Sequence, residues 1–209
     1  MQETIYHYLC KKVELRPDQM RVIPWDDMEE VVLVETASGA SARMSTTAKA
    51  CWTEAYVCFL FRCQDDYIVA NYTNRDDPIY NEDVVEIFID EAGDGRRYIE
   101  FELSPKLVVF DAVIENDLAG HIKLDIAWNI DDLITSVYRL EDSKYPYEYE
   151  IMIPHHTFSN SIATGKQWRV NLYRIDEQKD GAKEYLAWSP TKAIDFHKPE
   201  YFGYMTFIE

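Results

Sequence analysis

The feature that most constrains the fold is a two-residue alternation of apolar and polar side chains, which recurs along most of the sequence. It is clearest in Tyr98–Leu103, where Ile99 and Phe101 are expected to face the interior while Glu100 and Glu102 face solvent. Successive side chains of a β-strand point to opposite faces, so this pattern is typical of a strand with one buried face. It predicts a protein built from strands.

Several other segments share the strand signature. Ala55–Cys63 is apolar on both faces and is expected to be a central strand, and Tyr67–Tyr72 follows a short polar turn as its hairpin partner would. Val84–Asp90 is strongly strand-forming, with Val85 and Ile87 on one face. Further strands are expected at Tyr147–Ile153, Trp168–Ile175, Tyr185–Trp188 and Tyr204–Ile208, and weaker ones at Val31–Glu35, Ala48–Trp52 and Leu107–Ile114.

Helix signals are poor by comparison. The segment Asp131–Leu140 could hold a turn or two of helix, and His155–Phe158 is expected to form a short helical turn after Pro154. No internal repeat, low-complexity tract or linker divides the chain. We therefore expect one all-β domain over residues 1–209, an antiparallel β-sandwich of the jelly-roll or immunoglobulin-like two-sheet type with few short helical turns.

The chain is strongly acidic, with a formal net charge of −17 at pH 7. Such a surface repels phosphate backbones and anionic lipid, so neither nucleic acid nor a membrane is an expected partner. The sequence also lacks a run of apolar residues long enough to span a bilayer. A neutral ligand or a divalent cation remains compatible, and solubility alone would also explain the acidity.

The four cysteines are Cys10, Cys51, Cys58 and Cys63, and no two of them form a CxxC pair. Cys58 and Cys63 lie on one expected strand with an odd spacing, so they should point to opposite faces and not bridge. Four reduced, mostly buried thiols favour a reducing compartment. The sequence as it stands is therefore expected to be cytoplasmic, or extracellular or periplasmic if a signal peptide has been removed.

Three segments carry a resemblance to a known family. They are Asp76–Asp90 (DDPIYNEDVVEIFID), Trp168–Asp176 (WRVNLYRID) and Trp188–Phe207 (WSPTKAIDFHKPEYFGYMTF). In this order they resemble the motifs of family 9 carbohydrate-binding modules, and the resemblance runs from about Ala48 to the C-terminus. It implies a β-sandwich that binds carbohydrate without chemically changing it.

The resemblance also implies where the ligand would lie. In that family a sugar end is gripped between two aromatic rings, which fall here on Tyr80 and Phe196, where well-known sugar-binding members have tryptophan. Glu86 matches a family carboxylate that hydrogen-bonds sugar hydroxyls. A family arginine falls on Glu102, and a family asparagine near the second ring falls on Ala193.

From these correspondences we expect a shallow cleft flanked by Tyr80 and Phe196. Its expected lining residues are Glu86, Asn171, Tyr173 and Asp195, with Tyr173 replacing a family amide. Aromatic rings bury the C–H face of a pyranose at little entropic cost, and charged carboxylates accept strong hydrogen bonds from hydroxyls. The expected ligand is a mono- or oligosaccharide, and protein partners are left open.

Two alternatives concern the same residues. Tyr80 could be an ordinary loop tyrosine and Phe196 a core residue, which would leave a protein-interaction domain that has lost sugar binding. Glu86, Glu100 and Glu102 could instead supply the carboxylate pair of a glycoside hydrolase, although no other catalytic motif accompanies them. A non-catalytic role is preferred.

Cofactor chemistry has weaker signals. Met152, Met205 and His197 could ligate a haem, although their spacing does not single them out. Asp76–Asp77 and Asp90–Glu91 cluster carboxylate oxygens on turns, as calcium requires, but not with the spacing of an EF-hand loop. No cofactor is expected, and a structural calcium ion is left open.

Overall fold

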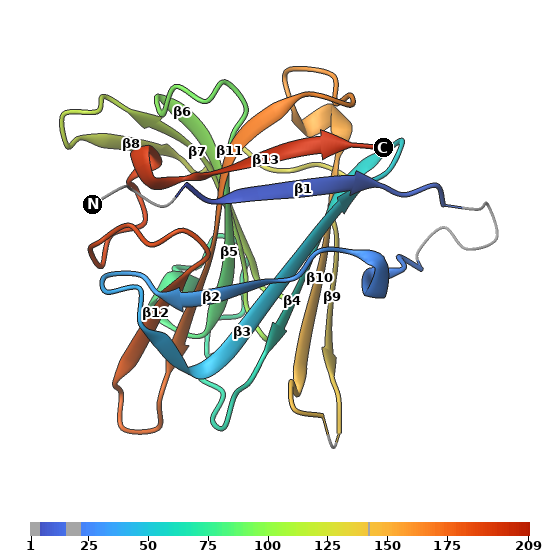
Figure 1. Cartoon of the computed structure of the whole chain (residues 1–209). Helices are drawn as coiled ribbons and strands as arrows, with labels where there is room; N and C mark the ends of the chain where they lie inside the picture. Colours follow the sequence, from blue (N-terminus) through green and yellow to red (C-terminus); the bar gives the residue numbers. More distant parts are fainter. Residues whose placement is uncertain (1–4, 16–21, 142) are drawn as a thin grey trace.

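The computed structural model describes residues 5–15, 22–141 and 143–209, and these fold almost entirely as β-strands (Figure 1). In these ranges the regular elements are strands and single turns of 3-10 helix. The strands are β1 (His7–Lys12), β2 (Val31–Glu35), β3 (Ser41–Trp52), β4 (Tyr56–Cys63), β5 (Val84–Asp90), β6 (Arg97–Leu103), β7 (Val109–Asn116), β8 (Ile122–Asp125), β9 (Ile134–Arg139), β10 (Tyr147–Pro154), β11 (Gln167–Glu177), β12 (Lys183–Ala187) and β13 (Gly203–Ile208). The 3-10 turns are η1 (Trp25–Asp27), η2 (Ile79–Asn81), η3 (His155–Thr157) and η4 (Pro199–Tyr201). The all-β prediction is confirmed.

The strands join into one hydrogen-bonded sheet instead of two separate ones. The main path runs β8-β7-β6-β5-β11-β12-β2-β3-β4-β10-β9, while β1 pairs with β13 and β3, and β13 pairs with β11. The strands β11, β12, β2, β3, β1 and β13 therefore close a ring. Figure 1 shows β1 and β13 side by side in this ring, running in parallel. The prediction of a two-sheet sandwich is corrected accordingly.

Two short strand pairings, at corners of the ring, complete its closure. Strands β12 and β2 pair through only Leu186–Glu35 and Ala187–Val34. The pairing of β1 with β3 is equally short, at Lys11–Cys51 and Lys12–Trp52. Two further groups of strands extend from the ring, one through β5 and the other through β4. The sequence pattern of single strands could not reveal such corners because they depend on how distant strands meet.

The inner faces of the strands form the principal core. Ile87 and Ile89 on β5, Phe101 on β6 and Phe59 and Phe61 on β4 all belong to one buried hydrophobic cluster. The predicted inward direction of Ile99 and Phe101 is confirmed, since both belong to the same cluster. Burying this much apolar surface is the main stabilising contribution.

The opposite face of β5 and β6 is buried too, which corrects one expectation. Glu100 and Glu102, predicted to face solvent, are only 5% and 0% exposed. A second hydrophobic cluster on this face includes Ile79 from η2, Phe88 from β5 and Phe202 after η4. Both faces of these strands are therefore covered, whereas alternation alone predicts one buried and one solvent-exposed face.

Other local predictions had mixed outcomes. Tyr67–Tyr72 is irregular and not a strand, because both edges of β4 are already occupied by β3 and β10. The expected helical turn at Asp131–Leu140 is also wrong, since it contains β9, which pairs with β10. The turn after Pro154 is confirmed as η3.

All four cysteines are buried and free, as expected. In the part of the chain that the structure describes, no helix is long and apolar enough to cross a membrane.

Candidate functional site

A pocket of about 290 Å³ lies over the outer face of β5 and β6. Apolar and aromatic side chains form most of its wall, and acidic side chains reach it from the strands below. Its lining residues are Tyr80, Glu86, Phe88, Glu100, Ile122, Leu124, Ile175, Tyr185, Ile194, Asp195, Phe196 and His197. The volume is near the lower end of the roughly 300–1,000 Å³ range typical of small-molecule sites.

Tyr80 reaches the pocket from the short turn η2. Pro78 precedes this turn, and Ile79 anchors it because its side chain is only 1% exposed. The Tyr80 ring is 43% exposed and packs edge-on against Phe110, with ring centroids 5.7 Å apart. One ring edge is thus fixed while much of the ring remains available to a ligand.

Phe196 reaches the same pocket from the irregular segment after β12. Its ring stacks on Tyr173 with centroids 4.1 Å apart and an interplanar angle of 9°. The Tyr173 hydroxyl donates a 3.1 Å hydrogen bond to the backbone carbonyl of Phe196. Ring and backbone are thus held by the same residue, which makes Phe196 a rigid platform.

The predicted site residues divide into two layers. Tyr80, Glu86, Asp195 and Phe196 all line the pocket. Asn171 and Tyr173 are fully buried and do not line it. These two residues lie behind the pocket wall and support it.

Asn171 holds this supporting layer together. Its side-chain amide donates 2.8 Å hydrogen bonds to the Tyr173 hydroxyl and to the Ser189 carbonyl. Its Oδ1 accepts a 3.0 Å bond from the Ser189 backbone N–H. The amide therefore fixes Tyr173, and through it Phe196, to the chain that follows β12.

Three buried glutamates lie below the pocket. Glu86 on β5 is directly opposite Glu102 on β6, and Glu100 is two residues before it. One oxygen from each carboxylate lies within 4.8 Å of the others. Glu86 Oε1, Glu100 Oε2 and both oxygens of Glu102 are buried without a hydrogen-bond partner.

Burial and mutual repulsion favour the protonated forms of these glutamates. Burial raises the pKa of Glu100 to about 7, against a smaller lowering by the adjacent Glu102. Burial and the neighbouring glutamates raise the pKa values of Glu86 and Glu102 well above their ordinary range. Glu100 and Glu102 were not among the expected lining residues, although Glu102 falls on a family arginine position; their alternating position on one strand beside Glu86 was a further signal.

His197 borders the glutamates from the same segment as Phe196. Its Nδ1 is 3.0 Å from the Tyr98 hydroxyl, and its Nε2 is 3.9 Å from Glu100 Oε1. Burial lowers the pKa of His197, while Asp195 acts in the opposite direction. The ring is therefore held mainly neutral and offers little positive charge to Glu100.

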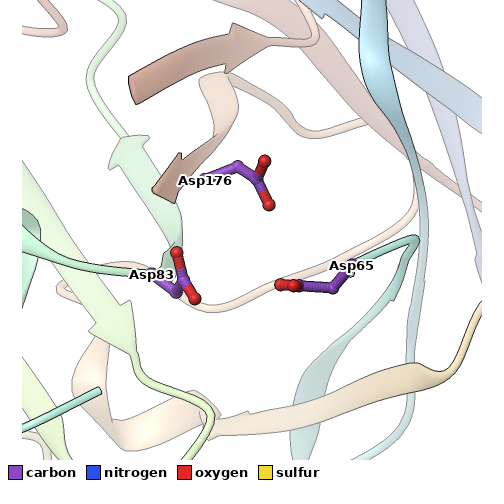
Figure 2. A group of neighbouring side chains, drawn as sticks. All are labelled: Asp65, Asp83 and Asp176. Carbon is purple, nitrogen blue, oxygen red and sulfur yellow. The ribbon is translucent and has the colours of Figure 1, made fainter. Parts of the chain in front are cut away.

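A second acidic group lies elsewhere and is already neutralised. Asp65, Asp83 and Asp176 place one oxygen each within 4.8 Å of the others (Figure 2). Arg174 donates bonds of 2.8 Å to Asp65 and 2.6 Å to Asp176, and Arg43 donates one of 2.9 Å to Asp176. Both oxygens of Asp83, and the second oxygen of Asp65, accept backbone N–H groups. These residues do not fit a calcium ion because every carboxylate oxygen is already bonded and a guanidinium lies beside them.

Two of the other predicted metal candidates, Asp90 and Asp77, have structural roles. Asp90 accepts backbone N–H groups from Ala92, Gly93 and Gly95 at 2.7–3.1 Å, which closes the turn after β5. Asp77 accepts the backbone N–H groups of Thr73 and Asn74. Their oxygens serve the turns that carry them.

The haem candidates do not converge on one site. Met152 and Met205 belong to different hydrophobic clusters, and His197 packs against Phe88 and Tyr98. This arrangement provides no pair of axial ligands.

A larger hollow of about 770 Å³ contains none of the predicted site residues. Its arginine, Arg169, donates to the backbone carbonyls of Phe202, Pro199 and Glu200. Since that guanidinium already holds the chain around η4, the pocket with Tyr80 and Phe196 is the better candidate site.

Comparison with known proteins identifies relatives over nearly the whole chain. The family model described as "Carbohydrate family 9 binding domain-like" matches residues 23–209. A protein of Arthroderma benhamiae described as "Extracellular protein" is 25% identical over 201 residues, which cover 91% of this chain and 90% of that protein.

Solved structures share the fold. A Bacteroides uniformis protein solved at 2.70 Å resolution has a TM-score of 0.77 and 16% identity, covering 98% of this chain and 100% of its own. A family 9 carbohydrate-binding module of Caldicellulosiruptor kristjanssonii in complex with cellotriose has a TM-score of 0.69 and 14% identity, covering 97% of this chain and 93% of its own. A family 9 carbohydrate-binding module of Caldicellulosiruptor kristjanssonii in complex with glucose has a TM-score of 0.65 and 15% identity, covering 94% of this chain and 95% of its own.

Proposed function

The chain belongs to the carbohydrate family 9 binding domain-like family, and from this membership we propose that it binds a mono- or oligosaccharide in the pocket of Tyr80 and Phe196. The two rings would contact the sugar, and Glu86 and Asp195 would accept hydrogen bonds from its hydroxyls. The observation that carries the proposal is that Tyr80 and Phe196, which are far apart in the sequence, line one pocket.

The physical chemistry of the pocket supports a sugar ligand. A pyranose offers apolar C–H faces and a rim of hydroxyls, so it needs ring surfaces and polar acceptors close together. Aromatic and aliphatic side chains provide the first, and the acidic residues provide the second. Phe196 is fixed by its stack on Tyr173, so little conformational entropy is lost when a ligand contacts it.

The family is one of non-catalytic binding domains, and we assign no reaction to the glutamates. General acid catalysis requires a carboxyl group that can reach the glycosidic oxygen, with a second carboxylate on the other side of the bond. Here Glu86, Glu100 and Glu102 form one group on adjacent strands on one side of the pocket.

We also propose an extracellular setting, as described for the Arthroderma benhamiae relative. The cytoplasmic location expected from the cysteines has no comparable support. All four thiols are buried, and buried thiols are unreactive in either compartment.

Isothermal titration with glucose and cellotriose tests the binding proposal. We expect saturable binding of at least one of them, and about a tenfold or greater loss of affinity in Tyr80→Ala and in Phe196→Ala. Each substitution removes the contact area of one aromatic ring, for which roughly 1.5–3 kcal/mol is typical.

The matched control is Tyr138→Ala, which removes a tyrosine on β9 that is 47% exposed and does not line the pocket. This variant should bind like the parent protein. If the parent protein binds neither glucose nor cellotriose, the proposal is contradicted for these ligands. Unchanged affinity in both pocket variants would show that the sugar binds at another site.

A further inference from the structure

The two groups of buried carboxylates differ in how their charge is compensated. Around Asp65, Asp83 and Asp176, all six oxygens accept hydrogen bonds, and Arg174 and Arg43 supply positive charge. In the glutamate group, four oxygens of Glu86, Glu100 and Glu102 are buried and unpartnered. Unpaired carboxylates are costly to bury, so in its ionised form this group has the acceptors of an ionic site without a counter-charge.

Two of the four unpartnered oxygens belong to side chains that reach the pocket. Glu86 and Glu100 are 1% and 5% exposed and line its wall, and Glu102 lies fully buried beside them. The charged neighbours that raise the pKa values of Glu86 and Glu102 are the other glutamates of the group. A positively charged ligand group entering the pocket would meet these carboxylates first.

We propose that Glu86, Glu100 and Glu102 recognise the ammonium group of an amino sugar, so that the pocket prefers a hexosamine to a neutral hexose. This inference rests on the proposed carbohydrate-binding function and specifies the class of sugar. The rings of Tyr80 and Phe196 would hold the C–H surface of the sugar while its ammonium group points to the glutamates.

The carboxylates lie close enough together to share a single ammonium nitrogen. An ammonium group donates three hydrogen bonds in tetrahedral directions, and charge-assisted bonds are about 2.8 Å long. Two acceptors of one such nitrogen are then about 4.6 Å apart. The three glutamates place their ligand oxygens within 4.8 Å of one another, an upper limit that admits this geometry.

The remaining wall favours an organic cation over a metal ion. Calcium takes six to eight oxygen ligands, commonly with backbone carbonyls and water among them. The neighbouring pocket residues Phe88, Ile175 and Tyr185 instead present mainly carbon surface. An amino sugar uses both parts of the pocket, because its ring is apolar on its faces and its ammonium is charged.

Other titratable groups also lie around the glutamates, among them Tyr185 on β12. Tyr80 from η2 and both Asp195 and His197 from the segment after β12 line the pocket, and Tyr98 on β6 contacts His197. Burial lowers the pKa of His197, so it does not act as a permanent counter-charge to Glu100. Tyr98 and Tyr80 stay neutral near neutral pH, since a phenol ordinarily titrates at about pH 10 and burial raises the pKa of each further.

Isothermal titration of the full chain with glucosamine, N-acetylglucosamine and glucose near neutral pH tests the inference. The three sugars share one ring, and only glucosamine carries an ammonium group. We expect glucosamine to bind about tenfold or more tightly than either neutral sugar, as one or two charge-assisted hydrogen bonds would give. This comparison within the parent protein needs no variant.

Substitutions then locate the preference. Glu100→Gln should reduce the preference for glucosamine over glucose to about threefold or less, because it removes one charge at the pocket wall. Glu115→Gln is the matched control: it removes the same charge from an exposed position on the neighbouring strand β7, and it should retain the preference.

The outcomes separate the inference from the proposed function. Equal affinities for all three sugars would leave carbohydrate binding standing and overturn the amino-sugar preference. If none of these sugars binds, and cellotriose does not bind either, the proposed function fails as well. A saturable heat with calcium chloride alone that disappears in Glu100→Gln would assign the glutamates to a metal ion and overturn the inference.

Discussion

Glu102 is fully buried opposite Glu86, and neither of its oxygens has a hydrogen-bond partner. Burial and the adjacent glutamates raise its pKa well above the ordinary range, so the folded protein binds a proton here more tightly than the unfolded chain does. The stabilising effect of that proton is complete below the ordinary carboxyl pKa of about 4 and is lost as the pH rises through the folded-state pKa.

Other residues act in the same direction. Burial raises the pKa of Glu100 to about 7, that of Asp83 to about 7, and that of Asp65 to about 6 against the opposing effect of Arg174. Their combined contribution to the free energy of unfolding should therefore decrease between about pH 4 and pH 7.

Glu102→Gln should raise the free energy of unfolding near neutral pH, by about 1–3 kcal/mol, and flatten its decrease with pH. Glutamine preserves the shape of the side chain, removes the titrating group and can donate a hydrogen bond to Glu100. Urea unfolding at several pH values measures both effects. Glu115→Gln, at an exposed site, should change neither quantity appreciably. A neutral-pH destabilisation by Glu102→Gln would show that its carboxylate is compensated in the free protein.

At the level of elements, the start of β13 is constrained by the indole of Trp188. A Cβ atom at Gly203 would lie 2.6 Å from the Cη2 and Cζ3 atoms of that ring, closer than atoms can pack. Trp188 is only 4% exposed and belongs to the principal core, so the ring has little room to withdraw. Glycine is therefore required here for a close approach and not for a special backbone angle.

Gly203→Ala should lower the free energy of unfolding by about 1–3 kcal/mol, because overpacking forces β13 or Trp188 to shift. Urea unfolding measures the loss. In a Trp188→Phe background the same substitution should be less costly, since the smaller ring lacks the clashing atoms. An equal cost in both backgrounds would attribute the effect to the other close neighbour, the Tyr6 Cβ at 3.2 Å, instead of the indole contact.

The sequence predicted those elements whose identity is decided by their own side chains. Two-residue alternation located β5, β6 and β11, and the paired motifs brought Tyr80 and Phe196 to one pocket. The alternation could not show that Glu100 and Glu102 are buried. Their face of β6 is covered by η2 and by the distant segment around Phe202.

The expected strand at Tyr67–Tyr72 failed for a related reason. Strand formation needs a free edge, and β3 and β10 already occupy both edges of β4. Asn171 and Tyr173 were expected in the cleft, but strand alternation does not show the depth of a residue beneath a ring such as Phe196. In each case the deciding contact is between parts of the chain that no local pattern relates.

For the whole molecule, Arg174 joins the two halves of the ring through its interior. From β11 it donates to Thr46 on β3, at 2.9 Å, and to the backbone carbonyl of Gln64 after β4, at 2.6 Å. It also forms ion pairs with Asp65 and Asp176, whose side chains, like its own, are 2% exposed. One guanidinium therefore bonds to strands that are far apart along the sheet.

Arg174→Met should lower the free energy of unfolding by about 3–5 kcal/mol, because it leaves buried carboxylates without their positive partner. Urea or thermal unfolding measures the change. Arg62→Met breaks a pair with Glu148 in which both side chains are partly exposed, and it should cost about 1 kcal/mol or less. A loss in Arg174→Met no greater than in Arg62→Met would mean that the aspartates are neutral in the folded protein.

The aromatic make-up of the pocket also decides how occupancy can be observed. Its rings are tyrosine and phenylalanine, and none of the five tryptophans is among the lining residues. Trp25, Trp52, Trp168 and Trp188 are buried elsewhere, at 4–8% exposure. Indole fluorescence should therefore stay flat on saturation, whereas chemical shifts of the Tyr80 and Phe196 rings should move, so a silent emission titration would carry no information about affinity.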